Sequence, residues 1–135
     1  MCHKCRPREA IRANPERSMT SDADTVSYPV GATIIRQGQE ERCFYVLEKG
    51  SVEVIKDGVV LNVLMYPGTI FGEISSILGK PRTSTVRART ATLCTRYTCE
   101  DLPAFTSAHP EIAVRMLETL AGRLDRTTQK LTDSL

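Results

Sequence analysis

The sequence predicts a mainly β fold with helices toward its C-terminal end. From Thr25 to about Thr98, short runs rich in Val, Ile, Thr and Tyr alternate with glycine or other turn residues. Glycine supplies the positive φ angles of tight turns, and here it recurs at strand-length intervals. Beyond residue 98 the apolar period changes from that of strands to that of a helix. Eight or so short strands punctuated in this way indicate an antiparallel roll or sandwich.

The predicted strands follow one another along the chain. The first five are TVSYPV, TIIRQ, CFYVLEK, SVEVIKD and VVLNVLMYP, closed by Gly31, Gly38, Gly50, Gly58 and Gly68. Two more, TSTVRART and ATLCTRYT, begin after residue 82. Alternation is clearest in SVEVIKD, where Val52 and Val54 lie on one face and Glu53 and Ile55 on the other.

Two helices are predicted after the strands. EDLPAF begins a short one, capped by Thr98 or Cys99, and HPEIAVRMLETLAGRLDRTTQKL a long one with Pro110 in its first turn. Along the long helix an apolar seam recurs every three or four residues. Its members are Ala113, Leu117, Leu120, Leu124, Thr127 and Leu131. The seam fits docking on the roll and equally fits a partner helix in a dimer, and both alternatives stay open.

Residues 1–24 predict a flexible basic N-terminal arm. This segment has few large apolar side chains, and its five basic ones are Lys4, Arg6, Arg8, Arg12 and Arg17. Too little apolar surface is present to offset the entropy of ordering it. Its CHKC motif offers three soft ligands, whereas structural zinc takes four, so we expect no metal there.

Composition excludes several classes of protein. With 18 basic and 16 acidic residues, the net charge of +2 is too small to predict binding to nucleic acid or membrane by bulk charge. No apolar run approaches the ~18 residues of a membrane span, and no apolar segment follows the basic start as in a signal peptide. The odd number of cysteines, five, does not form a disulfide framework, which favours a reducing, cytoplasmic location.

An enzyme is not expected. Ser-His-Asp and Cys-His arrangements cannot be read from the sequence, and the strands carry no histidine clusters for a metal-dependent reaction. GEISSILGK has six residues between its glycines rather than four, and Pro81 follows Lys80, so it is not the phosphate loop of a nucleotide hydrolase. We therefore expect no cofactor.

The stretch FGEISSILGKPRTSTV, residues 71–86, contains the residues that predict a ligand-binding site. EISSIL predicts one helical turn with Ile74, Ile77 and Leu78 on one face. The first turn of such a helix presents free backbone N–H groups, and Gly72 lets an anion approach the backbone. Arg82 follows at the start of a strand, and a guanidinium can make two parallel hydrogen bonds to a phosphate.

Glu73 is unexpected beside an anion, unless the ligand also carries hydroxyl groups. A ribose has them, and a carboxylate accepts hydrogen bonds from hydroxyls. The residues therefore predict a ligand with one sugar and one phosphate in a compact pocket.

FGEISSILGKPRTSTVRA resembles the phosphate-binding cassette of the cyclic nucleotide-binding domain family. This family includes catabolite-activator-type regulators, kinase regulatory subunits and nucleotide-gated channels. The resemblance extends upstream through YPVGATIIRQGQEERCFYVLEKGSVEV and downstream through HPEIAVRMLETLAGRL, and covers about residues 27–131. It implies one domain over residues 25–135. An antiparallel jelly-roll β-roll (25–98) would contain a short cassette helix and be followed by C-terminal helices (99–131).

The resemblance implies roles for individual residues. Glu73 would bind the ribose 2′-hydroxyl and Arg82 the exocyclic phosphate oxygens. The purine would lie against strand side chains and under the last helix. The remaining implied ligand contacts are Gly72, Ile74 and Ser75 through backbone N–H groups, Thr83 near phosphate and base, Val63 and Phe71 against the purine, and Arg123, Arg126 and Thr127 on the helix. Ser84 stands where the family more often has Ala.

The implied ligand is cAMP or cGMP. An Arg-Thr pair, as at Arg82 and Thr83, occurs in members that favour cGMP, but soluble modules of bacterial type more often use cAMP, which we therefore favour. The implied function is a stand-alone sensor that moves its C-terminal helix on binding and signals through a homodimer or partner protein. Alternatives are a scaffold that has lost its ligand, a fragment of a larger regulator or channel, and an arm that recruits an acidic surface.

Overall fold

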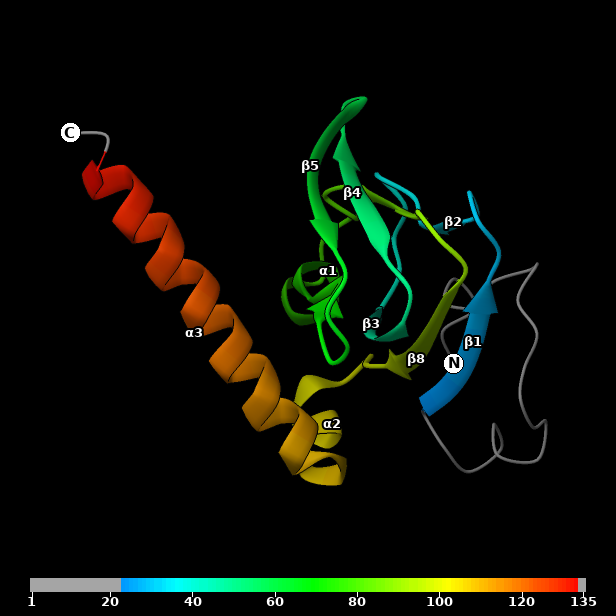
Figure 1. Cartoon of the computed structure of the whole chain (residues 1–135). Coiled ribbons are helices and arrows are strands. Elements are labelled where there is room, and N and C mark those ends of the chain that lie inside the picture. The colour runs from blue at the N-terminus through cyan, green and yellow to red at the C-terminus, as the bar shows by residue number, and fades with distance from the viewer. Residues whose placement is uncertain (1–22, 134–135) are drawn as a thin grey trace. The chain divides into compact units, whose positions relative to one another are not determined.

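The computed structural model describes residues 23–133, which form eight strands and three helices (Figure 1). These elements divide into two compact units with the boundary between Glu100 and Asp101. The predicted arm lies outside the described residues, except for Ala23 and Asp24. Both already belong to the first strand, so the roll begins slightly earlier than predicted.

The first unit contains two four-stranded sheets in which every pairing is antiparallel. One sheet has the order β1-β8-β3-β6, with β1 (Ala23–Tyr28), β8 (Thr92–Thr98), β3 (Cys43–Lys49) and β6 (Ile70–Phe71). The other has the order β2-β7-β4-β5, with β2 (Thr33–Ile35), β7 (Thr85–Ala88), β4 (Val52–Lys56) and β5 (Val59–Leu64). The predicted antiparallel roll of about eight strands is confirmed.

The core of the roll follows from strand register. Cys94 of β8 lies opposite Val26 of β1 on one side and opposite Leu47 of β3 on the other, and all three are buried. Directly opposed residues of antiparallel strands point to the same face, so this row packs inward as a unit. The other buried members of this core are Tyr28, Ile34, Ile35, Cys43, Tyr45, Val52, Phe71, Val86 and Ala88.

Strand β6 is the element that the sequence pattern missed. It has two residues, which pair with Tyr45 and Val46 of β3 at the edge of the first sheet. Two residues are too few to show an alternating pattern. The strand leads directly to α1 (Glu73–Leu78), so the helical turn predicted from EISSIL begins at a sheet edge.

The second unit consists of α2 (Leu102–Ala108) and α3 (Pro110–Asp133). The predicted cap of the first of these helices, Thr98 or Cys99, is wrong. The side chain of Asp101 accepts a hydrogen bond from the backbone N–H of Ala104 at 3.4 Å. A carboxylate is a favoured N-cap acceptor, and the helix therefore begins after it.

Part of the apolar seam predicted on α3 is exposed. Leu117, Leu124 and Leu131 are 68%, 67% and 65% exposed, whereas Ile112 and Met116 are buried. Among the described residues, no helix is both long enough and apolar enough to cross a membrane.

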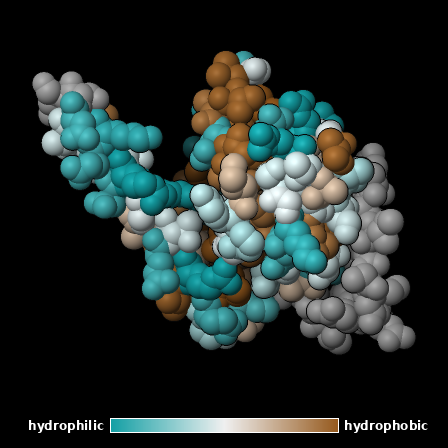
Figure 2. All heavy atoms as spheres, viewed as in Figure 1, coloured by the Kyte–Doolittle hydropathy of each residue, from teal (hydrophilic) through white to brown (hydrophobic). Residues whose placement is uncertain are grey.

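A second exposed apolar group lies on the β4–β5 hairpin. Val59, Val60 and Leu61 are each at least half exposed. Figure 2 shows hydrophobic residues gathered at the end of this hairpin, which Figure 1 labels. The apolar side chains of β5 therefore do not belong to the core, except where Leu64 packs against it.

Candidate functional site

Helix α1 lies between two glycines that have positive φ angles. Gly72 is its N-cap with φ 80°, and Gly79 is its C-cap with φ 67°. A Cβ atom at position 72 would lie 2.8 Å from Cδ1 of Ile35 and 3.1 Å from Nη1 of Arg82. Gly72 is therefore required both by its backbone conformation and by the close approach of neighbouring side chains.

The face that α1 buries is polar. Glu73, Ser75 and Ser76 are at most 3% exposed, whereas Ile74 is 41% and Leu78 66% exposed. The apolar side chains predicted to share one face are thus the more exposed ones. Buried polar groups are uncommon unless they are hydrogen-bonded. Oγ of Ser75 accepts a hydrogen bond from Arg82, whereas Oγ of Ser76 has no partner among the described residues.

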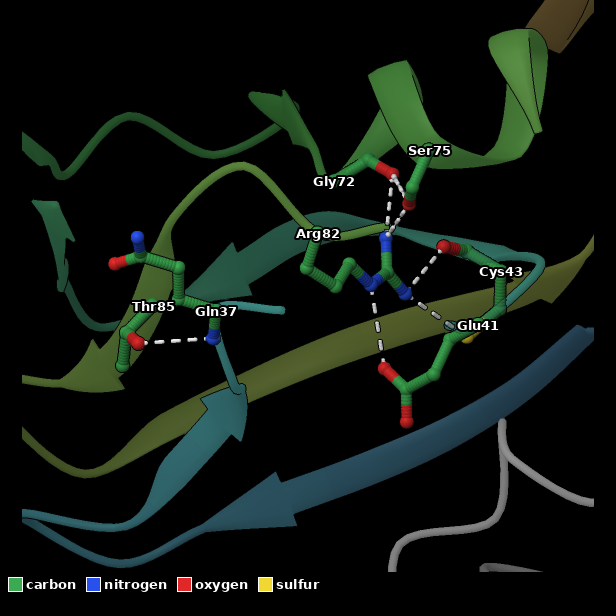
Figure 3. A network of polar contacts seen from close by, with 7 residues as sticks. All are labelled: Gln37, Glu41, Cys43, Gly72, Ser75, Arg82 and Thr85. Carbon is green, nitrogen blue, oxygen red and sulfur yellow. Dashed lines mark hydrogen bonds and ion pairs between the residues drawn. The ribbon is translucent and has the colours of Figure 1, made fainter. Parts of the chain in front are cut away.

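Arg82 is the centre of those contacts, as Figure 3 shows. Its side chain is 2% exposed. Nη1 donates to the backbone oxygen of Gly72 at 2.7 Å and to Oγ of Ser75 at 2.5 Å. Nη2 donates to the backbone oxygen of Cys43 at 2.7 Å and to its Sγ at 3.4 Å. Nε forms an ion pair with Oε1 of Glu41 at 3.2 Å.

These contacts use the full donor capacity of the guanidinium. An arginine side chain has five N–H donors, and the five bonds described above match that number. An anion that binds Arg82 must therefore replace at least one protein acceptor. Among the bonds described above, Glu41 is the one charged acceptor, so an anion that takes its place would preserve the charge balance around Arg82.

Glu41 and Cys43 were not among the predicted site residues. Both lie some 40 positions before Arg82 in the sequence, and no local pattern marks them. The general rule that a buried cation needs a counter-charge would have predicted some acid near Arg82, but not which one.

Arg82 lies against the first turn of α1, which contains Glu73, the other residue on which the prediction depends. Arg82 bonds Gly72 and Ser75, the residues that flank Glu73 and Ile74, and Glu73 itself is 3% exposed. Thr83 and Ser84 follow Arg82 and are half-buried. The next residue, Thr85, accepts a hydrogen bond from the backbone N–H of Gln37 at 3.0 Å (Figure 3).

The residues predicted to contact the base are more dispersed. Val63 is half-buried on β5. Phe71 is 3% exposed and stacks on Tyr45, with ring centroids 5.3 Å apart. Arg123, Arg126 and Thr127 lie on α3 in the second unit, where Thr127 donates to the backbone oxygen of Arg123 at 2.9 Å. Their approach to a ligand stays a prediction.

The interior beside the site keeps two tyrosine phenols and one cysteine thiol neutral. Burial raises the pKa of the Tyr45 phenol, and neighbouring Cys43, Tyr28 and Glu41 raise it further. Burial likewise raises the pKa of Tyr28 and brings that of the Cys94 thiol to about 12. Within residues 23–133, no group of three His, Cys, Asp or Glu side chains could hold a metal ion.

Comparison with known proteins identifies the family to which this fold belongs. The family model described as the cyclic nucleotide-binding domain matches residues 25–109, more than half of the chain. The chain therefore belongs to the cyclic nucleotide-binding domain family, and the predicted resemblance is confirmed.

Two relatives come from different branches of the family. The cAMP-dependent protein kinase regulatory subunit of Emericella nidulans is 42% identical over 77 residues, 56% of this chain and 19% of that protein. The CRP-like cAMP-activated global transcriptional regulator of Mycobacterium tuberculosis is 30% identical over 129 residues, 93% of this chain and 58% of that protein. The chain thus spans about a fifth of the first relative and less than two thirds of the second.

Solved structures agree on the fold. The Thermus thermophilus catabolite activator protein superposes with a TM-score of 0.71 at 26% identity, covering 89% of this chain and 59% of that one. A cyclic nucleotide-binding domain from Methylobacillus flagellatus gives a TM-score of 0.67 at 21% identity, covering 88% and 71%. The predicted jelly-roll fold is confirmed.

Proposed function

We propose that this chain is a sensor module that binds cAMP in preference to cGMP. The observation that carries the proposal is the position of Arg82. It is a buried guanidinium bonded to both the N-cap and the first turn of α1, the turn that contains the buried residue Glu73. A cation and an acid at one place suit a ligand with both a phosphate and a ribose hydroxyl.

Binding of the phosphate requires Arg82 to exchange partners. In this structure Glu41 supplies the negative charge beside Arg82, and Cys43 accepts through Sγ at 3.4 Å. A phosphate oxygen would take the place of one or both acceptors, and the backbone N–H groups of residues 72–75 would add donors. The carboxylate of Glu41 and the phosphate of the ligand would thus compete for the guanidinium of Arg82.

The base would contact side chains of the roll. Val63 and Phe71 would lie against it and Thr83 near it, and these assignments rest on the family resemblance. The names of the kinase subunits and of the M. tuberculosis regulator refer to cAMP, which supports adenine over guanine. The hydroxyl of Thr83 would make the discrimination against cGMP incomplete.

The response would pass to α3. Arg123, Arg126 and Thr127 would reach the base, so nucleotide would favour one position of the helix over another. The exposed Leu117, Leu124 and Leu131 recur every seven residues, which is the spacing of a helix that pairs with a second copy or a partner. Partner binding through this seam would carry the signal onward.

A scaffold that has lost its ligand is the second candidate. The observation that favours it is the complete satisfaction of Arg82 by protein acceptors, because a fully bonded guanidinium gains less from a phosphate than a free one.

Calorimetric titration separates the two candidates. We expect cAMP to bind more tightly than cGMP, and both more tightly than non-cyclic AMP. At about 100 times its Kd, cAMP should add about 2.7 kcal/mol to the free energy of unfolding. Absence of binding by all three at millimolar concentration would rule out the nucleotide sensor and favour the scaffold, and tighter binding of cGMP would reverse the proposed base preference.

The role of Glu73 has its own test. We expect Glu73→Gln and removal of the ligand's 2′-hydroxyl, as in 2′-deoxy-cAMP, each to weaken binding, and the double change to cost little more than either alone. Fully additive losses would mean that Glu73 does not contact this hydroxyl.

A further inference from the structure

Helix α1 has an arginine at each end. At its start, Arg82 donates to the backbone oxygen of Gly72. At its end, Nη2 of Arg42 donates to the backbone oxygen of Ser76 at 3.3 Å. The same guanidinium lies against the C-cap, because a Cβ atom on Gly79 would be 3.5 Å from Nη1 of Arg42.

The helix needs a cation at its C-terminal end and does not supply one. The last carbonyl groups of any helix lack intrahelical partners and form the negative end of its dipole. The last turn of α1 contains no basic residue. A helix of six residues is also too short to be stable without outside contacts. Arg42 supplies the missing charge from the residue just before β3.

The main chain of Arg42 is held firmly in place. Its backbone oxygen accepts a hydrogen bond from the backbone N–H of Cys99 at 2.8 Å. The next residue, Cys43, is completely buried, and its backbone oxygen is one of the acceptors of Arg82. Arg42 therefore contacts the C-terminal end of α1 directly. The next residue, Cys43, is bonded to Arg82, which contacts the N-terminal end of the same helix.

The side chain of Arg42 also has an unsatisfied donor. Its Nε is buried and has no hydrogen-bond partner within residues 23–133. Buried polar atoms without a partner are rare, because each costs the desolvation of a polar group. The position is therefore occupied by arginine despite this cost, which points to a role for the two Nη groups on α1.

We propose that Arg42 is a positioning residue of the nucleotide site. It fixes the C-terminal end of α1, and so keeps the N–H groups of residues 72–75 directed at the phosphate. This inference rests on the proposed function, because it assigns to Arg42 an effect on nucleotide affinity. Arg42 does not contact the ligand in this account and acts through the orientation of α1.

Three variants test the proposal. Arg42→Met keeps most of the aliphatic stem and removes every donor, and Arg42→Lys retains the charge. Lys80→Met is the matched control, because Lys80 is an exposed cation directly after Gly79. Two quantities are measured in each variant: cAMP affinity by calorimetry, and hydrogen exchange of the Gly79 amide, which donates to Ser75 at 2.9 Å. The Leu47 amide in the core serves as the reference for global unfolding.

We expect Arg42→Met to bind cAMP roughly tenfold more weakly and to exchange the Gly79 amide faster without nucleotide, at an unchanged Leu47 rate. Lys80→Met should change neither quantity, and Arg42→Lys should lie between Arg42→Met and the parent. Unchanged affinity in Arg42→Met, or equal losses in Arg42→Met and Lys80→Met, overturns the proposal. If the parent itself binds no nucleotide, the proposed function fails together with the site role of Arg42. The Gly79 exchange rate then still reports whether Arg42 holds α1.

Discussion

Two buried arginines in the roll differ in what holds them. The side chains of Arg82 and Arg96 are each 2% exposed, and each forms an ion pair with one carboxylate. Arg96 lies on β8 and pairs at 2.7 Å with Asp24, the residue directly opposite it on β1. Arg82 lies in the connection after α1, and its acceptors come from α1, its N-cap and the segment 41–43.

The difference separates a structural ion pair from an exchangeable one. Burial opposes the charge of Arg96, but the hydrogen bond to Asp24 and nearby Tyr45 and Cys43 raise its pKa overall. Asp24 lies directly opposite Arg96 in the strand register, so the two residues stay adjacent as long as β1 pairs with β8. We propose that Arg82, whose partner Glu41 lies outside the strands, exchanges this carboxylate for another anion. Burial of an arginine therefore does not by itself identify a binding site.

The largest effect on stability should come from Arg96→Met. Removal of the cation leaves Asp24 without its charge partner at a side-chain exposure of 16%. We expect the free energy of unfolding to fall by about 3–5 kcal/mol in urea denaturation, with unchanged cAMP affinity of the folded protein. A large loss of affinity at unchanged stability would place Arg96 in the site and remove the distinction between the two arginines.

Arg82→Gln should have its main effect on nucleotide affinity, whereas Arg96→Met mainly affects stability. We expect cAMP affinity to fall by about 2–4 kcal/mol, roughly 30- to 700-fold, because a buried phosphate loses its charge partner. Stability should also fall, since Glu41 loses its cation. Arg87→Gln is the control, because Arg87 is an exposed arginine of β7 that pairs with Glu53. Equal affinity of Arg82→Gln and the parent, measured by calorimetry, would contradict the assigned role.

Gly72→Ala tests the crowding around Arg82. Gly58 is the matched control, because its φ of 82° is close to that of Gly72 and nothing lies within 4 Å of a Cβ placed there. Both substitutions should cost about 1–2 kcal/mol of stability through backbone strain. Only Gly72→Ala should also weaken cAMP binding, since its Cβ meets Ile35 and Arg82. Equal affinities of the two variants would mean that the close approach at Gly72 does not matter for binding.

Glu41→Gln should strengthen nucleotide binding. The neutral amide competes less well than a carboxylate for Arg82, and the ligand-free protein loses the counter-charge of a buried cation. We therefore expect the free energy of unfolding without ligand to fall by about 1–2 kcal/mol and cAMP affinity to rise several-fold. Weaker binding would show that Glu41 orients Arg82 for the phosphate instead of competing with it.

The last prediction concerns the pH dependence of stability and Cys94 of the core. The pKa of Cys94 is raised from 9.0 to about 12, because burial disfavours the thiolate. A raised folded-state pKa means that the stabilisation is fully present below about pH 9 and is lost as pH rises toward 12. Cys94→Ala should flatten the decline of stability above pH 9 in denaturation experiments. An unchanged slope would assign the decline to other groups, such as the buried tyrosines.

The sequence predicted what is contiguous in the chain. Glu73 and Arg82 lie within one stretch of ten residues, and an acid and an arginine in that stretch predict a ligand with a hydroxyl and a phosphate. Most strands are followed directly by the residues of their own turn. The two residues of β6 lack a period, and the cap at Asp101 was missed although its residue type suits that role.

The acceptors of Arg82 could not be predicted in the same way. Glu41 and Cys43 reach it across some 40 residues through the pairing of β3 with its neighbours. Single-sequence patterns report the face on which a residue lies, but they do not report which distant residue meets it. The counter-charge and the contact of Arg42 with α1 both depend on that tertiary information.

The most direct measurement follows the Nε–H resonances of the two arginines by NMR during titration with cAMP, assigned with Arg82→Gln and Arg96→Met. We expect the Arg82 signal to shift as Glu41 is replaced by phosphate, and the Arg96 signal to change little because Asp24 stays in place. Equal responses of both signals, or binding of cAMP without any change at Arg82, would mean that Arg82 does not exchange Glu41 for the phosphate.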